Sequence, residues 1–299
     1  MRNIDHIVSS VKASPAPGLV VDRPLPSPQV EYISPFLMID HFGPTTVPAR
    51  ENGGAGLSPH PHRGFETVTL LLDGAMEHRD SAGNHGVLRP GDVQWMTAAR
   101  GILHAEYHEA EFARTGGSLH GLQLWINLPR RFKMSPPAYQ DLTAARIPVV
   151  EERDATVRAS VRVIAGEFGG IAGPARTFTP LLVLHVRLRA GAMLEVPVEG
   201  GEKSGWNALA YVIEGAAVAR TPEGDVPLAA RQMAVFARQG GALSLFSDAG
   251  AQVLILAGEP IDEPVASWGP FVMNTQQEIL QARSDFSAGL MGRLEGVPY

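Results

Sequence analysis

The sequence contains no cysteine among its 299 residues. This absence excludes disulfides, thiolate nucleophiles, iron–sulfur clusters and cysteine-bound zinc. The sequence also has no run of about 18 apolar residues, the minimum for a membrane-spanning helix. Its first residues, Met1 to His6, carry charge where a secretory signal would need an apolar stretch. We therefore expect a cytoplasmic protein that is neither exported nor anchored in a membrane.

Positive charge is also in short supply. The chain has 25 Lys and Arg residues against 31 Asp and Glu residues, a formal net charge of -6. Such a balance offers no long-range attraction to nucleic acid or anionic lipid, so neither is expected as a direct partner. Apolar residues make up 44% of the chain and charged residues 19%. These proportions are typical of a globular protein with a sizeable core.

Helical periodicity is scarce, and short strands dominate the pattern. Apolar runs such as 68–72 and 93–96 end at turn residues, and Gly 32 and Pro 24 supply many such turns. Strand-like runs that recur at this spacing indicate an all-β sandwich or barrel. One helix is expected near the C-terminus, over residues 275–282, where Asn274 or Thr275 can cap the first turn.

The chain contains an internal repeat at an offset of 141 residues. At this offset Leu72 aligns with Ile213 and Trp95 with Phe236, within stretches that share apolar alternation and turn residues. A repeat of this kind predicts two copies of one β-unit. The stretch 128–148 contains Pro136 and Pro137 and is expected to be the linker, because proline cannot donate to a sheet ladder. The expected domains are therefore 1–140 and 141–299.

Two short motifs indicate metal chemistry. His60-Pro61-His62 and His104-Ala105-Glu106 each place two potential ligands at positions i and i+2. Residues with this spacing on a strand point to the same face, where two side chains can bind one ion. The alternative for each histidine alone is a surface or core residue with ordinary hydrogen bonds. The paired pattern favours a single metal site with three imidazoles and one carboxylate.

The repeat provides an internal control for this prediction. The offset of 141 residues carries the four candidate ligands onto residues that are not a plausible ligand set: Gly201, Lys203, Leu245 and Ser247. The β-pattern therefore persists in the second copy without the donors. This difference indicates that the donors serve chemistry in the first copy and are not required by the fold.

Several long motifs resemble the pirin family, a group of bicupins. The resemblance spans nearly the whole chain and is carried by residues 36–44, 59–69, 78–84, 90–98, 101–106 and 269–275. It implies two cupin β-barrel (jelly-roll) domains face to face, with a metal only in the N-terminal barrel. The family ligands correspond to His60, His62, His104 and Glu106, and iron is the metal most often associated with pirins.

The ligand chemistry limits the metal without naming it. Three neutral imidazoles and one carboxylate leave a net single positive charge on a divalent ion, with coordination positions free for substrate or O₂. The expected cofactor is one divalent transition metal, Fe(II) first, with Ni, Cu, Mn or Zn as alternatives. Glu106 is the candidate catalytic residue, and it can be either a permanent ligand or a general base.

The resemblance leaves two kinds of function open. Some pirins are similar to quercetin 2,3-dioxygenases, which implies a small phenolic, flavonol-like substrate and O₂. Others are described as transcription cofactors or partners of metabolic enzymes, which implies a non-enzymatic, metal-dependent or redox-dependent regulator of a protein partner. We expect the dioxygenase function and a monomeric protein.

Overall fold

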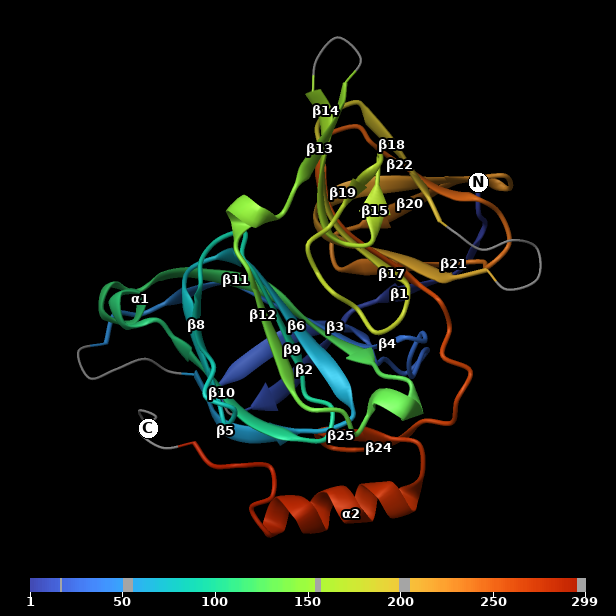
Figure 1. Cartoon of the computed structure of the whole chain (residues 1–299). Coiled ribbons are helices and arrows are strands. Elements are labelled where there is room, and N and C mark those ends of the chain that lie inside the picture. The colour runs from blue at the N-terminus through green and yellow to red at the C-terminus, as the bar shows by residue number, and fades with distance from the viewer. Residues whose placement is uncertain (17, 51–55, 154–156, 199–204, 295–299) are drawn as a thin grey trace. The chain divides into compact units, whose positions relative to one another are not determined.

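The computed structural model describes residues 1–16, 18–50, 56–153, 157–198 and 205–294 (Figure 1). Strands dominate these residues. The helical elements are the α-helices α1 (Ala110–Thr115) and α2 (Gln276–Ser287) and the 3₁₀ turns η1 (Arg130–Phe132) and η2 (Ala144–Arg146). The expected all-β fold with a short C-terminal helix is confirmed. In the described part of the chain, neither helix is long and apolar enough to cross a membrane.

The first barrel consists of two antiparallel sheets. Its larger sheet has the order β12 (Ala138–Leu142), β9 (Val93–Thr97), β6 (Phe65–Asp73), β11 (Gly117–Asn127), β4 (Phe36–Val47), β3 (Leu19–Leu25) and β2 (Val11–Ala16). Its smaller sheet has the order β5 (Gly56–His62), β10 (Ile102–His108), β7 (Met76–Asp80) and β8 (His85–Leu88). The short pair β24 (Ala266–Trp268) and β25 (Phe271–Met273) lies beside α2.

The second barrel repeats this arrangement. Its larger sheet has the order β1 (Ile4–Ser9), β21 (Gln232–Phe236), β19 (Asn207–Thr221), β23 (Ala251–Gly258), β17 (Leu181–Leu188), β14 (Val157–Ala165) and β13 (Val149–Arg153). Its smaller sheet has the order β18 (Ala192–Pro197), β22 (Ala242–Ser247), the C-terminal half of β19, and β20 (Gly224–Ala229). The hairpin of β15 (Glu167–Phe168) and β16 (Ile171–Ala172) completes the strands.

The predicted repeat corresponds to equivalent strands. Leu72 lies on β6 and Ile213 on β19, which occupy the third position of their larger sheets. Trp95 and Phe236 lie on the neighbouring strands β9 and β21, and both side chains are buried. The pairing register differs slightly, because Trp95 lies opposite Val68 whereas Phe236 lies opposite Ala208. The two copies therefore share topology, with local shifts in register.

The chain groups into two compact units. The N-terminal residues belong to the unit of the second barrel, and the C-terminal residues belong to the unit of the first barrel. One unit contains residues 1–12, 22–35 and 145–260, and the other contains residues 13–21, 36–144 and 261–299. The N-terminal residues join the second barrel because β1 pairs with β21. The C-terminal residues join the first barrel because β25 and α2 contact it. This grouping differs from the continuous ranges 1–140 and 141–299 expected from the sequence.

The proline-rich stretch 128–148 is more structured than expected of a linker. Pro136 and Pro137 precede β12, which pairs with β9 and forms the edge of the larger sheet. An edge position tolerates prolines nearby, because one side of the strand needs no hydrogen-bond donors. The helix near the C-terminus begins as predicted, with the Thr275 side chain accepting a hydrogen bond from the Glu278 amide. It continues to Ser287, beyond the expected residue 282.

Candidate metal centre

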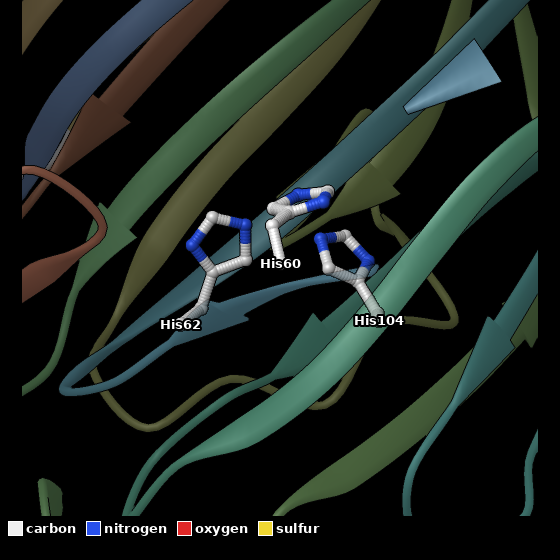
Figure 2. Close-up of side chains that lie close together, drawn as sticks. All are labelled: His60, His62 and His104. Atoms are coloured by element: carbon white, nitrogen blue, oxygen red, sulfur yellow. The ribbon is translucent and has the colours of Figure 1, made fainter. Parts of the chain in front are cut away.

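The candidate site lies on two paired strands of the smaller sheet in the first barrel. His60 and His62 are on β5, and His104 lies directly opposite His60 on β10. Because alternate residues of a strand point to the same face, the three imidazoles meet on the interior side. Figure 2 shows their rings turned toward one another. One ligand atom from each residue lies within 4.8 Å of the others.

The rings are close and mostly shielded from solvent. The ring centroid of His104 lies 4.3 Å from that of His60 and 4.8 Å from that of His62. His62 and His104 are buried, with 3% and 1% of their surface exposed, and His60 is partly buried. Trp125 and Phe65 contact the ring of His62 edge-on. This packing restricts the side-chain rotations that would separate the three imidazoles.

The free ring nitrogens of the cluster fit a metal ion. His60 uses Nδ1 to contact the Ser58 carbonyl oxygen at 2.9 Å, which leaves Nε2 available. His62 Nδ1 and His104 Nε2 are buried and have no hydrogen-bond partner among the described residues. A buried polar atom without a partner costs roughly 1–3 kcal/mol, and such atoms are rare in native structures. A divalent cation would supply the missing partner for these nitrogens.

Burial favours the neutral form of two of these imidazoles, His62 and His104. Burial lowers the pKa of His62 well below its usual value, and the neighbouring His60 lowers it further. Burial likewise lowers the pKa of His104, with additional contributions from His60, His62 and His78. A neutral imidazole is the form that binds metal, because the lone pair is then not occupied by a proton.

The structure places Glu106 beside this cluster and not within it. Glu106 follows His104 by two residues on β10 and is buried. The Gln123 side-chain amide donates to both of its carboxylate oxygens at 3.1 Å, and Thr69 Oγ1 donates at 3.3 Å. The structure therefore brings three of the four predicted ligands together. The four-ligand set including Glu106 stays a prediction.

The turn after His62 is fixed by residues that are distant in sequence. Gly64 has a φ of 90°, and a Cβ there would overlap the Val272 carbonyl oxygen. Lys133 is buried beneath this turn, and its Nζ donates to the Gly64 carbonyl at 2.7 Å, the Val272 carbonyl at 2.9 Å and Asn127 Oδ1 at 2.6 Å. These contacts hold the end of β5 against β25.

Sequence reasoning missed a polar group beside the site. The segment His78-Arg79-Asp80 precedes a turn, and the Ala82 and Asn84 amides donate hydrogen bonds to Asp80 there. The structure also shows that His78 and Asp80 occupy β7, directly beside β10. Both side chains are buried next to His104. The available signal was the i, i+2 spacing, the same as in the two ligand motifs.

The equivalent positions in the second barrel are apolar. On β18 and β22, Leu194 lies opposite Leu245 as His60 lies opposite His104, and Val196 takes the place of His62. Ser247, the counterpart of Glu106, donates to the Ala216 carbonyl on β19. Leu194, Val196 and Leu245 belong to the buried core. Gly201 and Lys203, the counterparts expected from the constant offset, lie outside the described residues.

The described residues form two β-barrels of one topology and contain a three-histidine cluster in the first barrel. This combination defines a bicupin with a candidate metal centre. The chain matches the family model described as Pirin over residues 18–126. It also matches the Pirin C-terminal cupin domain over residues 183–292. The chain therefore belongs to the pirin family.

Several proteins are similar to this chain over most of its length. A Pseudomonas aeruginosa protein named "putative quercetin 2,3-dioxygenase" is 45% identical over 260 residues, which cover 87% of each chain. Pirin from Mus musculus is 39% identical over 290 residues, covering 95% of this chain and 92% of the mouse protein. The crystal structure of quercetin 2,3-dioxygenase from Acinetobacter baumannii superposes with a TM-score of 0.89 at 37% identity, covering 98% of this chain and 99% of that one.

Proposed function

We propose that this protein is a metal-dependent dioxygenase of the quercetin 2,3-dioxygenase type, which cleaves a flavonol-like phenol with O₂. The observation that carries the proposal is the cluster of His60, His62 and His104, in which buried ring nitrogens lack partners among the described residues. The names of the relatives at 45% and 37% identity support the reaction class. We expect a monomer that acts in the cytoplasm.

The three imidazoles would hold one divalent ion, with the Glu106 carboxylate as the fourth ligand. Imidazole suits Fe, Ni, Cu and Zn, so this donor set alone does not select the metal. We propose Fe(II), with Ni, Cu, Mn and Zn as alternatives that reconstitution decides. When bound, such an ion acidifies a coordinated hydroxyl group and provides a route for electrons to O₂.

In this proposal Glu106 acts as the general base in the state in which its carboxylate has released the ion. Its carboxylate is buried two residues from His104 on the same strand. Hydrogen bonds from Gln123 and Thr69 orient both oxygens. A substrate hydroxyl that reaches the cluster would lie near this carboxylate, which can accept its proton. Gln123 therefore positions the base, and the barrel walls exclude water from it.

The test is O₂ consumption with quercetin, measured in an oxygen electrode on protein reconstituted separately with Fe(II), Ni(II), Cu(II), Mn(II) and Zn(II). We expect quercetin-dependent O₂ uptake with at least one metal, and none in the His60→Ala/His104→Ala double variant. Metal content is measured on each sample. Lack of uptake with every metal would contradict the dioxygenase and favour a metal-dependent regulator of a protein partner.

A further inference from the structure

A buried string of polar side chains leads from the proposed metal ligand His104 to Asp80. His104 Nδ1 lies 3.4 Å from Nδ1 of His78, on the neighbouring strand β7. His78 Nε2 in turn lies 3.5 Å from Asp80 Oδ2, and both of these side chains are almost fully buried. His78 therefore contacts two groups with its two ring nitrogens. Its Nδ1 contacts His104, and its Nε2 faces Asp80.

The string admits one self-consistent arrangement of protons. If His104 carries its proton on Nδ1, that proton is donated to His78 Nδ1, and the proton of His78 is then on Nε2, facing the Asp80 carboxylate. The N–H of His104 then points to an acceptor at 3.4 Å, the N–H of His78 faces the Asp80 carboxylate at 3.5 Å, an ion-pair distance, and His104 Nε2 presents a lone pair. In the opposite arrangement, His78 Nε2 would direct a lone pair at a carboxylate, and a proton would occupy His104 Nε2.

We infer that His78, oriented by Asp80, is a positioning residue that fixes His104 in the Nδ1–H tautomer and so keeps Nε2 free to bind the metal. The inference rests on the metal centre of the proposed function. Metal-binding histidines usually donate their second N–H to a carboxylate or carbonyl group, which fixes the tautomer and the ring orientation. Here an imidazole stands between the ligand and the carboxylate.

The groups around His78 are themselves held in place. Asp80 accepts hydrogen bonds from the Ala82 amide at 2.9 Å and from the Asn84 amide and side chain at 3.0 and 2.8 Å. The Tyr139 ring stacks on His78, with centroids 5.1 Å apart and planes 28° apart. Tyr139 Oη accepts a hydrogen bond from Gln94 at 3.0 Å. The orientation of His78 is therefore defined from two sides.

The second barrel lacks this string together with the ligands. Ala219 lies opposite Leu245 as Asp80 lies opposite His104, so Ala219 is the counterpart of Asp80. Two residues earlier, Ala217 corresponds to His78, and both alanines belong to the apolar core. The fold therefore does not require polar residues at these two positions. His78 and Asp80 are present in the barrel that contains the histidine cluster, as expected of residues that position a ligand.

The first test needs no metal. Histidine ¹⁵N chemical shifts of the metal-free protein report which ring nitrogen carries the proton. We expect His104 to be protonated on Nδ1 in the wild type, and we expect a mixture of tautomers in His78→Phe, which retains the stacking on Tyr139 but removes both nitrogens. A wild-type His104 protonated on Nε2 would overturn the inference without further experiments.

The second test measures affinity for Zn(II) and, anaerobically, for Fe(II) by competition with a chelator. We expect His78→Phe to bind each metal about 10- to 100-fold more weakly, the range found for residues that orient metal ligands. His78→Asn should recover most of this loss, because its Oδ1 can accept the proton of His104 Nδ1. His85→Phe is the matched control on β8, where the exposed His85 contacts Glu77, and it should leave affinity unchanged.

Asp80→Asn provides an independent variant in case His78→Phe does not fold. It removes the negative charge that orients His78, so we expect mixed tautomers of His104 and weaker metal binding. Wild-type affinity and wild-type tautomer in both folded variants would overturn the inference. Failure of the dioxygenase assay would not affect these readouts. If the wild type bound neither metal, the proposed function would fall, while the tautomer measurement would still decide the role of His78.

Discussion

The two barrels of this protein share a strand order and differ in what fills them. Where the second barrel places Leu194 opposite Leu245, the first places His60 opposite His104. The apolar set is part of a continuous buried core. The histidine set instead leaves buried nitrogens without partners in the described part of the first barrel.

This difference separates an interior filled for stability from one that contains a candidate metal site. Apolar side chains in a β-barrel stabilise it by leaving water, at about 25 cal/mol for each Å² buried. Imidazoles in the same positions contribute less to stability until a ligand satisfies them. The polar residues His78 and Asp80 extend the contrast, since their counterparts are alanines. The first barrel is therefore the one that we propose binds a metal.

The largest expected effect is the loss of metal from the first barrel. In the His60→Ala/His104→Ala variant, elemental analysis should fall from about one ion per chain to nearly none, because two of the proposed ligands are removed. The matched variant Leu245→Ala should keep its metal but lose about 2–5 kcal/mol of unfolding free energy, the usual cost of a Leu-to-Ala change in a core. If the His60→Ala/His104→Ala variant still contained one ion per chain, the metal would not be bound by this cluster.

The next effect concerns catalysis by the carboxylate of the first barrel. Glu106→Gln preserves shape and an oxygen donor but removes the basic group. With metal restored, this variant should still shift the absorption of quercetin on binding, yet turn over at least about 10²-fold more slowly. Metal content must be measured in parallel, since weaker binding would also reduce the rate. Full activity would show that Glu106 is not the base.

A smaller effect is the pH dependence that Glu66 gives to the first barrel. Burial raises the pKa of Glu66 to about 7, although Thr97 Oγ1 donates to it at 2.7 Å. At the sequence offset of 141 residues, the second barrel has the neutral Asn207 on β19. Between pH 4.5 and about 7 the folded state holds a proton that the unfolded state has released, so this stabilisation decreases as pH rises from 4.5 to about 7.

Glu66→Gln tests this assignment because it removes the titration and keeps an oxygen acceptor for Thr97. Between pH 5 and pH 7 the wild type should lose about 2 kcal/mol of unfolding free energy relative to the variant. Chemical denaturation at several pH values measures the difference. If the difference in unfolding free energy between the wild type and Glu66→Gln stayed constant across this range, Glu66 would not titrate there.

The smallest effect is expected at the helix cap in the unit that contains the histidine cluster. Thr275 Oγ1 accepts from the Glu278 amide at 3.2 Å, and Glu278 Oε2 accepts from the Asn274 amide at 3.0 Å. Thr275→Ala should cost about 1 kcal/mol of unfolding free energy. Thr275→Ser, which retains the hydroxyl, is the control. Equal losses in both variants would exclude the cap as the cause.

Local patterns predicted much of the fold and most of the cluster. Strand runs between turns gave the all-β class, and the i, i+2 spacing placed His60 and His62 on one face of β5. These features depend only on neighbours along the chain. The exchange of the chain ends depends instead on the pairing of β1 with β21, far apart in sequence. A pattern of neighbouring residues cannot predict a pairing between strands so far apart in the chain.

Register explains the remaining differences. The constant offset carried His60 to Gly201, whereas pairing with β22 makes Leu194 its counterpart, because the connections between strands differ in length in the two barrels. The inward direction of His78 likewise follows from the pairing of β7 with β10. The hydrogen bonds of Glu106 with Gln123 depend on the packing of the two sheets.

The most direct test of the central claim, a single metal centre in the first barrel, is an anomalous difference map from crystals of the Fe(II)-loaded protein. The account predicts one peak per chain, about 2.0–2.2 Å from nitrogens of His60, His62 and His104 and from an oxygen of Glu106. A peak in the second barrel near Leu245, or iron bound without these three imidazoles, would contradict it.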